Sequence, residues 1–311
     1  EIPKRDWSSD VCSSDLDLEP APAADVLSRL GSLETAQRWE RSGAFGEAWS
    51  ACLDAIAERP FHPEAFVQLA SIATAAGELP TARDALHRAQ ALAPGWGVAR
   101  DLTAGLDRRG NGHGVPGRFT LPPRQSRLSV CLIVKNEEKF LDSCLASIVP
   151  VAHEIVVVDT GSTDRTVEIA HRHGARLASF RWCDDFSAAR NAGLAMARGD
   201  WVLILDADEE VHQGDLETLR RELGGDSNHL LLRLRCIQEL KGRQYQGYVP
   251  RLFRNAPGIR FEDRIHESVT RTVSALCHGW GMGLGLSRVR LIHHGYAPEV
   301  IEERGKISRN H

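Results

Sequence analysis

The sequence of 311 residues contains no apolar run of the ~20 residues that a membrane-spanning helix needs. Its longest apolar segments, VCLIV and WVLIL, have the length of β-strands. The N-terminus also lacks the apolar core of a signal peptide. We therefore expect a cytoplasmic protein, free or peripheral at the inner face of a membrane, with no transmembrane segment.

An excess of basic residues and a pattern of paired cysteines are missing as well. Lys and Arg number 38 against 42 Asp and Glu, so the chain lacks the basic face that a nucleic-acid partner requires. The seven cysteines form no CxxC pair, which gives little support to a zinc site. An odd, dispersed set of cysteines is typical of reduced thiols in a cytosolic protein.

The remaining patterns divide the chain into four segments. Residues 1–27 begin with an aperiodic stretch rich in Ser and Asp, and we expect a non-native or disordered leader there. Residues 28–109 carry a helical repeat, and residues 110–127 form a linker with Gly, Pro and Arg. Residues 128–311 form an α/β domain, which we expect to be truncated at its C-terminus because it ends where a helix begins.

The segment 28–109 contains identical residues 34 positions apart. The pairs are Gly43 and Gly77, Ala48 and Ala82, Ala51 and Ala85, and Pro60 and Pro94. Glycine suits a corner between helices, alanine lets helices approach closely, and proline ends a helix. The pattern resembles the tetratricopeptide repeat. Because about two repeats are too few for an independent array, we expect this arm to lean on the next domain or on a protein partner.

From residue 128 onward, short apolar strands alternate with helical patterns. The expected strands cover residues 128–134, 154–159, 175–180 and 201–206. Near-continuous apolar strands separated by helices predict a mostly parallel sheet with helices on both faces. After residue 228 the alternation of polar and apolar residues predicts antiparallel strands. The expected fold is α/β and Rossmann-like, preceded by an all-α helical-repeat arm.

Acidic and amide side chains follow the predicted strands, at the edge of the sheet where the strands have their carboxyl ends. Ligands of open parallel sheets bind at this edge. Asp206 and Asp208 are separated by one residue, so in extended chain their carboxylates point to the same side. Two such carboxylates repel each other unless a cation lies between them. Mg²⁺ or Mn²⁺ suits this oxygen-rich pair, and the alternative is that the two aspartates only cap a strand.

Four segments in this region resemble the successive motifs of glycosyltransferase family 2, whose fold is GT-A. They are IVKNEE (133–138), VVVDTGSTD (156–164), DFSAARNAG (185–193) and LILDADEE (203–210). The resemblance implies a nucleotide pocket made by Val134, Asn136, Glu137, Asp159, Arg190, Asn191 and Asp206. It also implies that Asp206 and Asp208 hold Mn²⁺ or Mg²⁺, with His293 of LIHHGY completing the coordination.

The segment FEDRIHE (261–267) holds three carboxylates and a histidine. An inverting transfer needs a base that takes the proton of the acceptor, and the resembled family has a carboxylate in this region. Glu267 is the favoured base and Asp263 the alternative, although either could instead anchor the loop. The cations available to balance a diphosphate leaving group are Lys135, Arg190, Arg251 and Arg264.

The resemblance implies a metal-dependent inverting glycosyltransferase that moves a sugar from a nucleotide-diphosphate donor, expected to be a UDP-sugar, to a protein or cell-envelope saccharide acceptor. A nucleotide-sugar-forming nucleotidyltransferase is one alternative, but KNEE lacks the glycine and the positive charge of its phosphate loop. A non-catalytic scaffold, in which the helical repeats bind a protein, is the other. The intact Asp-Ala-Asp argues against it.

Overall fold

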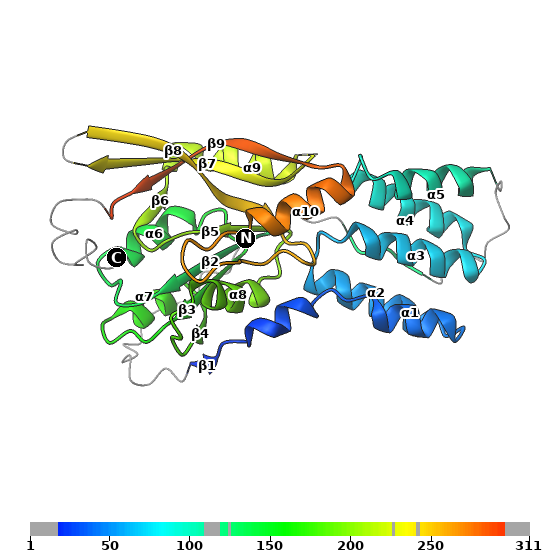
Figure 1. Ribbon diagram of the computed structural model, residues 1–311, viewed down its shortest axis with the longest axis horizontal. Helices are drawn as coiled ribbons and strands as arrows, with labels where there is room; N and C mark the ends of the chain where they lie inside the picture. The colour runs from blue at the N-terminus through cyan, green and yellow to red at the C-terminus, as the bar shows by residue number, and fades with distance from the viewer. Residues whose placement is uncertain (1–17, 109–118, 124–125, 226–227, 241–242, 296–311) are drawn as a thin grey trace.

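A helical arm stands at one end of an α/β domain in the computed structural model (Figure 1). The structure describes residues 18–108, 119–123, 126–225, 228–240 and 243–295. Most of the predicted leader, residues 1–17, and most of the predicted linker lie outside the described residues. None of the described helices has the length and apolar character needed to cross a bilayer.

Five helices make up the arm, namely α1 (Glu34–Arg41), α2 (Phe45–Glu58), α3 (Pro63–Ala75), α4 (Leu79–Leu92) and α5 (Gly97–Asp107). Gly43 lies in the corner between α1 and α2 and Gly77 in the corner between α3 and α4, with φ angles of 79° and 84°, in the left-handed region that favours glycine. Ala48 and Ala82 are fully buried where the helices meet. The tetratricopeptide-like arm predicted from the 34-residue period is therefore confirmed.

A nine-stranded sheet runs through the α/β domain in the order β1-β4-β3-β2-β5-β8-β7-β9-β6. The parallel part comprises β1 (Glu19–Pro20), β4 (Arg176–Ser179), β3 (Glu154–Asp159), β2 (Leu128–Val134) and β5 (Trp201–Ile204). The later strands are β6 (Glu209–Val211), β7 (His229–Leu240), β8 (Arg243–Arg254) and β9 (Gly283–His293). β8 is antiparallel to both β5 and β7, as predicted, whereas β9 pairs in parallel with β7.

Helices cover both faces of this sheet. One face packs on α6 (Leu141–Ile148), α7 (Thr166–Arg172) and α9 (Leu216–Gly224), the last preceded by η3 (Gln213–Asp215). The other face packs on α8 (Phe186–Met196), α10 (Thr270–Trp280) and the 3₁₀ helix η2 (Ala24–Ser28). β2 supplies Leu128, Val130 and Leu132 to the first core and Cys131 to the second, as a strand buried on both faces should. The predicted mostly parallel α/β sheet is confirmed.

The prediction of a disordered leader up to residue 27 needs correction for its last residues. Glu19 and Pro20 form β1, which pairs with β4 at the sheet edge. Leu27 is 4% exposed and belongs to the core beside α8. A two-residue strand and one turn of 3₁₀ helix are too short to produce a periodic apolar pattern, so the sequence alone did not reveal them.

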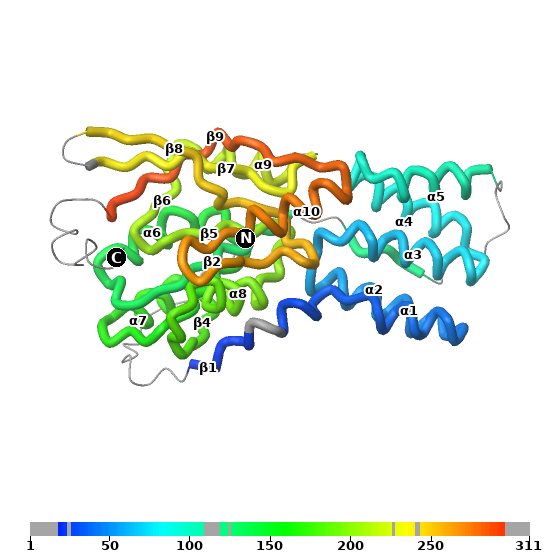
Figure 2. Tube along the Cα trace, viewed as in Figure 1, coloured from blue at the N-terminus to red at the C-terminus, as the bar shows by residue number. Residues whose placement is uncertain are grey.

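The arm packs against the amino ends of the parallel strands, which places it at the far end of the sheet from their carboxyl ends (Figure 2). The backbone N–H of Phe61 donates to the carbonyl of Asn255 at 3.1 Å. The guanidinium of Arg254 lies 3.8 Å from the ring centre of Trp201, the first residue of β5, and 5.1 Å from that of Phe61. Part of the predicted linker packs on the arm too, since Phe119 stacks on Trp49 at 4.5 Å.

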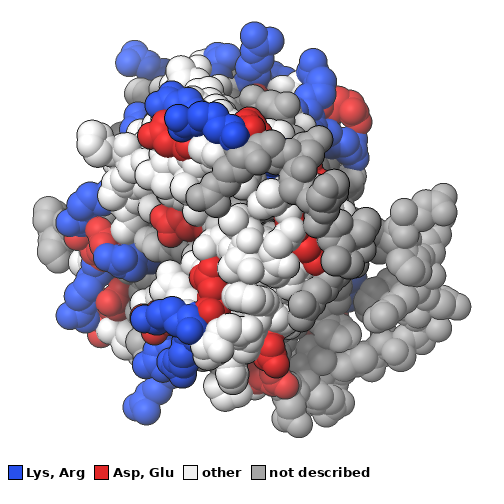
Figure 3. Space-filling model, turned by 90° about the vertical axis from the view of Figure 1, so that its right-hand side faces the viewer, with Lys and Arg blue, Asp and Glu red and all other residues white. Residues whose placement is uncertain are grey.

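The end of the arm presents a mixed surface. Uncharged and acidic side chains occupy much of the middle of this face, and Lys and Arg lie mainly toward its margins (Figure 3). A hollow of about 620 Å³ between α3 and α5 is lined partly by Glu40 and Asp101. The arm therefore carries a concave surface of its own, separate from the edge where the parallel strands end.

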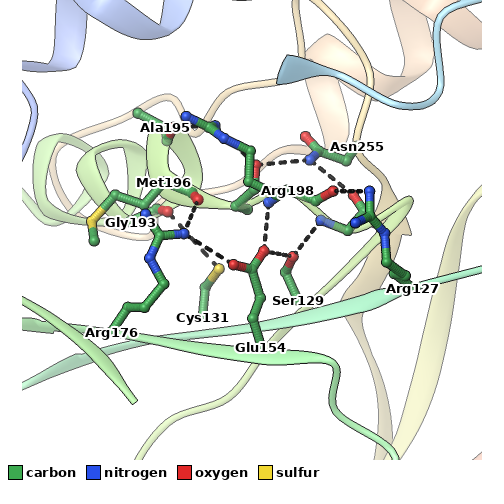
Figure 4. Close-up of polar contacts among 12 residues, drawn as sticks. Arg127, Ser129, Cys131, Glu154, Arg176, Gly193, Ala195, Met196, Arg198 and Asn255 are labelled. Atoms are coloured by element: carbon green, nitrogen blue, oxygen red, sulfur yellow. Dashed lines mark hydrogen bonds and ion pairs between the residues drawn. The ribbon is translucent and has the colours of Figure 1, made fainter. Parts of the chain in front are cut away.

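A polar network at the amino ends of the strands holds the C-terminal end of α8 (Figure 4). The carboxylate of Glu154 accepts from the Ser129 hydroxyl and the Arg198 backbone N–H, both at 2.5 Å, and from Arg176 at 3.0 Å. Asn255 donates to two carbonyl oxygens of the turn that follows α8. The network thereby ties the turn that follows α8 to the amino ends of β2 and β3.

We predict that Gly95→Ala destabilises the protein through the contact between arm and domain. A Cβ on Gly95, between α4 and α5, would lie 2.4 Å from the carbonyl oxygen of Gly281, which ends α10. Overpacking of this kind costs about 1–3 kcal/mol. The matched control is Gly105→Ala inside α5, where a Cβ meets no described atom within 4 Å and helix propensity improves by about 1 kcal/mol. Urea unfolding would measure both, and equal stability of the two variants would contradict this interface.

Candidate active site

The loops that follow β2 and β3 are bound to each other. The backbone N–H of Asn136 donates to the Ser162 hydroxyl at 2.9 Å, and the Asn136 side-chain oxygen accepts from the Thr163 N–H at 2.7 Å. Asn136 has a φ of 55°, a left-handed conformation that asparagine tolerates better than most residues. The Glu137 N–H donates to the Thr166 hydroxyl at 2.7 Å. The two strand ends therefore form one rigid wall.

Asp159 and Val134 lie side by side in this wall, as the ends of paired parallel strands. The Val134 carbonyl accepts from both the N–H and the hydroxyl of Thr160. The Asp159 carboxylate accepts from the backbone N–H groups of Gly161 and Ser162 at 3.1 Å. The predicted nucleotide-pocket residues Val134, Asn136, Glu137 and Asp159 are thus brought together, and Asp159 also shapes the loop.

Asp206 lies between two arginines. Its two carboxylate oxygens accept from Arg190 at 2.6 Å and from Arg251 at 2.5 Å. Burial alone would raise the pKa of Asp206, but the charges of Arg251 and Arg190 outweigh it and hold that pKa far below its usual range. Two guanidinium groups therefore lie beside Asp206, the residue for which the sequence predicted a cation.

Glu209 shares one of these arginines. Its side chain is 2% exposed and accepts from Arg251 at 2.7 Å. Burial, followed by the nearby negative charge of Asp206, raises the pKa of Glu209 above its usual value, although Arg251 acts in the opposite direction. Arg251 itself is mostly buried.

A β-bulge aims Arg251 at these carboxylates. Along β7 and β8 the register passes from Leu232 opposite Leu252 to Arg233 opposite Pro250, so Arg251 has no partner in the ladder. Pro250 has no N–H to donate, which favours an irregularity at this point. Bulges redirect a side chain out of the regular alternation and recur next to active sites.

Arg190 joins Asp206 to the predicted base. Its Nε donates to Glu267 at 3.0 Å while its terminal nitrogen donates to Asp206, and its side chain is only 6% exposed. The other candidate, Asp263, points elsewhere and accepts from Arg271 at 2.6 Å on the exposed side of the loop. The structure therefore places Glu267, and not Asp263, in contact with Arg190. The Asp206 cluster, as we call it below, consists of Asp206, Arg190, Arg251, Glu209 and Glu267.

The segment 261–267 is fastened along α8. The Asn191 amide bonds in both directions with the backbone of Phe261, at 3.0 and 2.8 Å. The Ser187 hydroxyl donates to the Asp263 carbonyl at 2.6 Å, and Arg264 donates to the carbonyl of Asp184. Asn191, predicted to bind the nucleotide, and Arg264, predicted to be available for the diphosphate, instead hold this loop in place.

Asp208 and His293 meet as predicted. His293 Nε2 lies 3.4 Å from an Asp208 oxygen, and both side chains are largely buried. A carboxylate and an imidazole suit Mn²⁺ or Mg²⁺ when phosphate oxygens fill the other positions, so this pair fits two ligands of such an ion. Within the described residues, no group of three or more His, Cys, Asp or Glu side chains is arranged to hold a metal. Asp206, bound to its arginines, does not join the pair.

Residues 129–270 match the family model described as Glycosyl transferase family 2. The match covers slightly less than half of the chain. The matched range includes the wall made by β2 and β3, the cluster around Asp206 and the loop with Glu267.

Several known proteins resemble parts of the chain. A TPR repeat-containing protein of Synechococcus elongatus is 40% identical over 192 residues, which are 59% of this chain and 46% of that protein. The prophage-derived glycosyltransferase SunS of Bacillus subtilis is 28% identical over 188 residues, 58% of this chain and 42% of that protein. The structure of S. aureus TarS in complex with UDP-GlcNAc has 20% identity and a TM-score of 0.42, covering 57% of this chain and 60% of that one. The chain spans less than half the length of these two curated relatives.

Two features of the α/β domain could not be read from the family motifs. Glu209 was visible only as one of four acidic residues in the five-residue run DADEE, and nothing in the sequence showed that it is buried. The bulge at Arg251 has one sequence signal, a proline inside a predicted strand. The thiols agree in part with expectation, because five of the six described cysteines are buried and Cys183 is exposed.

We predict that Arg251→Met destabilises the domain by about 3 kcal/mol at neutral pH, because it leaves Glu209 buried without its cation. Without Arg251 the folded-state pKa of Glu209 rises further above the unfolded value, so folding takes up a proton. The deficit relative to wild type should therefore be largest near pH 8 and shrink toward about pH 5.

Urea unfolding at both pH values measures this effect. The matched control, Arg251→Met combined with Glu209→Gln, removes the unpaired charge and should recover part of the lost stability near pH 8. A deficit that is the same at both pH values would contradict the charge-pairing account.

Proposed function

We propose that the α/β domain is a metal-dependent inverting glycosyltransferase that uses a UDP-sugar donor. The observation that carries this proposal is the placement of Arg190, which contacts both Asp206 and Glu267. One guanidinium thereby links the strand end that would face the diphosphate to the carboxylate that would face the acceptor. The proposal rests on the family 2 match together with this geometry.

In the proposed reaction, a nucleophilic atom of the acceptor attacks the anomeric carbon of the sugar. The bond between that carbon and the β-phosphate oxygen breaks, and the nucleotide diphosphate leaves with the electron pair. The acceptor proton passes to Glu267, which is 18% exposed and is oriented by its contact with Arg190. Attack from the face opposite the leaving group inverts the anomeric configuration.

The donor nucleotide is proposed to lie against the wall formed by the loops after β2 and β3. Asn136, Glu137 and Asp159 border this wall at the carboxyl end of the sheet, where ligands of open parallel sheets bind. Hydrogen bonds between the two loops keep the wall in shape before the nucleotide arrives.

Asp208 and His293 are proposed as the protein ligands of Mn²⁺ or Mg²⁺. When bound, the ion would neutralise charge on the diphosphate. Arg251 contacts both Asp206 and Glu209. Its positive charge partly balances the negative charge of these two carboxylates. This assignment changes the predicted role of Asp206 from a metal ligand to a partner of the two arginines.

We predict that Glu267→Gln lowers sugar transfer by about 100-fold or more, the usual contribution of a general base. Asp263→Asn is the matched control, because it lies in the same loop but contacts the exposed Arg271. It should change transfer by less than about threefold. Transfer of labelled sugar measures both variants, and equal losses would contradict Glu267 as the base.

We also predict that Asp208→Asn lowers Mn²⁺-dependent hydrolysis of UDP-sugar by about 100-fold. The neighbouring pair of Glu210 and His294 offers a control of the same chemistry, with 3.2 Å between the carboxylate and the imidazole. Glu210→Gln should hydrolyse the donor at the wild-type rate with an unchanged Mn²⁺ requirement. If Glu210→Gln loses metal dependence and Asp208→Asn keeps it, the assignment of the ion is wrong.

A further inference from the structure

The hairpin of β7 and β8 extends beyond the rest of the sheet (Figure 2). β8 is 12 residues long and pairs with β7 along almost its whole length. On its other side it pairs with β5 only at residues 252–254. Residues 243–248 are all exposed. β8 therefore has a long outer edge that, among the described strands, has no partner over residues 243–250.

An open strand edge is a template for another strand. Alternate residues of an antiparallel pair direct their N–H and C=O groups away from the partner, so the outer edge of β8 offers donors and acceptors at regular spacing. Pro250 supplies no N–H and limits regular pairing to residues 243–249. The edge is not blunted by acidic side chains, because β8 contains no Asp or Glu.

One end of this outer edge lies next to the candidate active site. In the sheet order β5 is the neighbour of β8, so a strand added to residues 243–249 would lie end to end with β5. The chain continues from β5 through Leu205 to Asp206. On β8 itself, Arg251 follows this edge directly and contacts Asp206. An added strand would therefore point at the cluster that the proposed reaction uses.

The chemistry of the edge identifies the class of its occupant. A polypeptide carries N–H and C=O groups at the strand spacing of about 3.4 Å, and a saccharide does not. Tyr245 and Tyr248 are 45% and 51% exposed and lie on opposite faces of the strand, where they can contact alternate side chains of an added segment.

We propose that the outer edge of β8 binds an extended segment of a polypeptide acceptor, which pairs as an additional strand and is guided to the Asp206 cluster. This inference rests on the proposed function and names the class of acceptor for the same site. It assigns acceptor binding to the hairpin, at the opposite end of the sheet from the helical arm.

Single proline substitutions at residues 244–248 of the full chain test this proposal. Each variant is assayed for melting temperature, for donor hydrolysis without acceptor, and for sugar transfer to a mixed-sequence peptide pool and to a pool of soluble oligosaccharides. Proline at a position whose wild-type N–H points to β7 should lower the melting temperature, because it removes a hydrogen bond between β7 and β8. Prolines at the alternate positions should leave melting and donor hydrolysis unchanged but lower peptide transfer by about tenfold or more, since a backbone hydrogen bond is lost.

A second arm of the test keeps the wild-type protein and changes the acceptor. Peptides N-methylated on every second amide should be transferred to at least about tenfold less efficiently than the unmodified pool. Transfer to oligosaccharides but not to peptides, or no transfer to either pool despite donor hydrolysis, would overturn the proposal. So would unchanged peptide transfer in all five proline variants, or a dimer formed through this edge. A wild-type protein without donor hydrolysis would instead count against the proposed glycosyltransferase.

Discussion

The two arginines that hold Asp206 are the interaction on which the rest of the site depends. Arg190 comes from α8 and Arg251 from β8, so one carboxylate at the end of β5 connects a helix on one face of the sheet with a strand of the sheet. Arg190 then carries the connection to Glu267, and Arg251 carries it to Glu209. Opposite charges in a partly buried site hold these five side chains in one arrangement, because any unpaired member would be costly to bury.

The arm and the site occupy opposite ends of the same sheet (Figure 1). Phe61, Trp201 and Arg254 join the arm to the amino end of β5, while Asp206 follows its carboxyl end. The arm therefore stabilises the start of the strand whose end carries the cluster, without lining the site. The hollow of the arm near Glu40 and Asp101 is a separate surface. Donor binding and any contact made by the arm are in this way spatially independent.

The strands, and the residues at the carboxyl edge of the sheet, could be predicted because short stretches of sequence identify them. The apolar runs of β2, β3 and β5 identified buried parallel strands, and the residue at each strand end necessarily lies at the carboxyl edge. The family resemblance also implied that His293 lies near Asp208, and the two side chains are 3.4 Å apart. The partners of Asp206 could not be predicted, because they lie 16 and 45 residues away and depend on how α8 and the β8 bulge are placed.

The contacts of the loop after β3 could not be predicted from the sequence either. α7 begins at Thr166, and Ser162 and Asp164, which precede it, accept hydrogen bonds from the backbone of residues 136 and 138. The family resemblance implied that Asn191 binds the nucleotide, yet its amide is engaged by the backbone of Phe261. Polar residues next to a site can serve the ligand or the loop, and only the tertiary contacts distinguish these roles.

A crystal structure of the full chain with UDP and Mn²⁺ tests the central claim most directly. The account predicts that the nucleoside lies against Asp159 and Asn136, with the ion on Asp208 and His293 and the diphosphate beside the Asp206 cluster. UDP bound at any other part of the fold, or an ion held without Asp208, would contradict it.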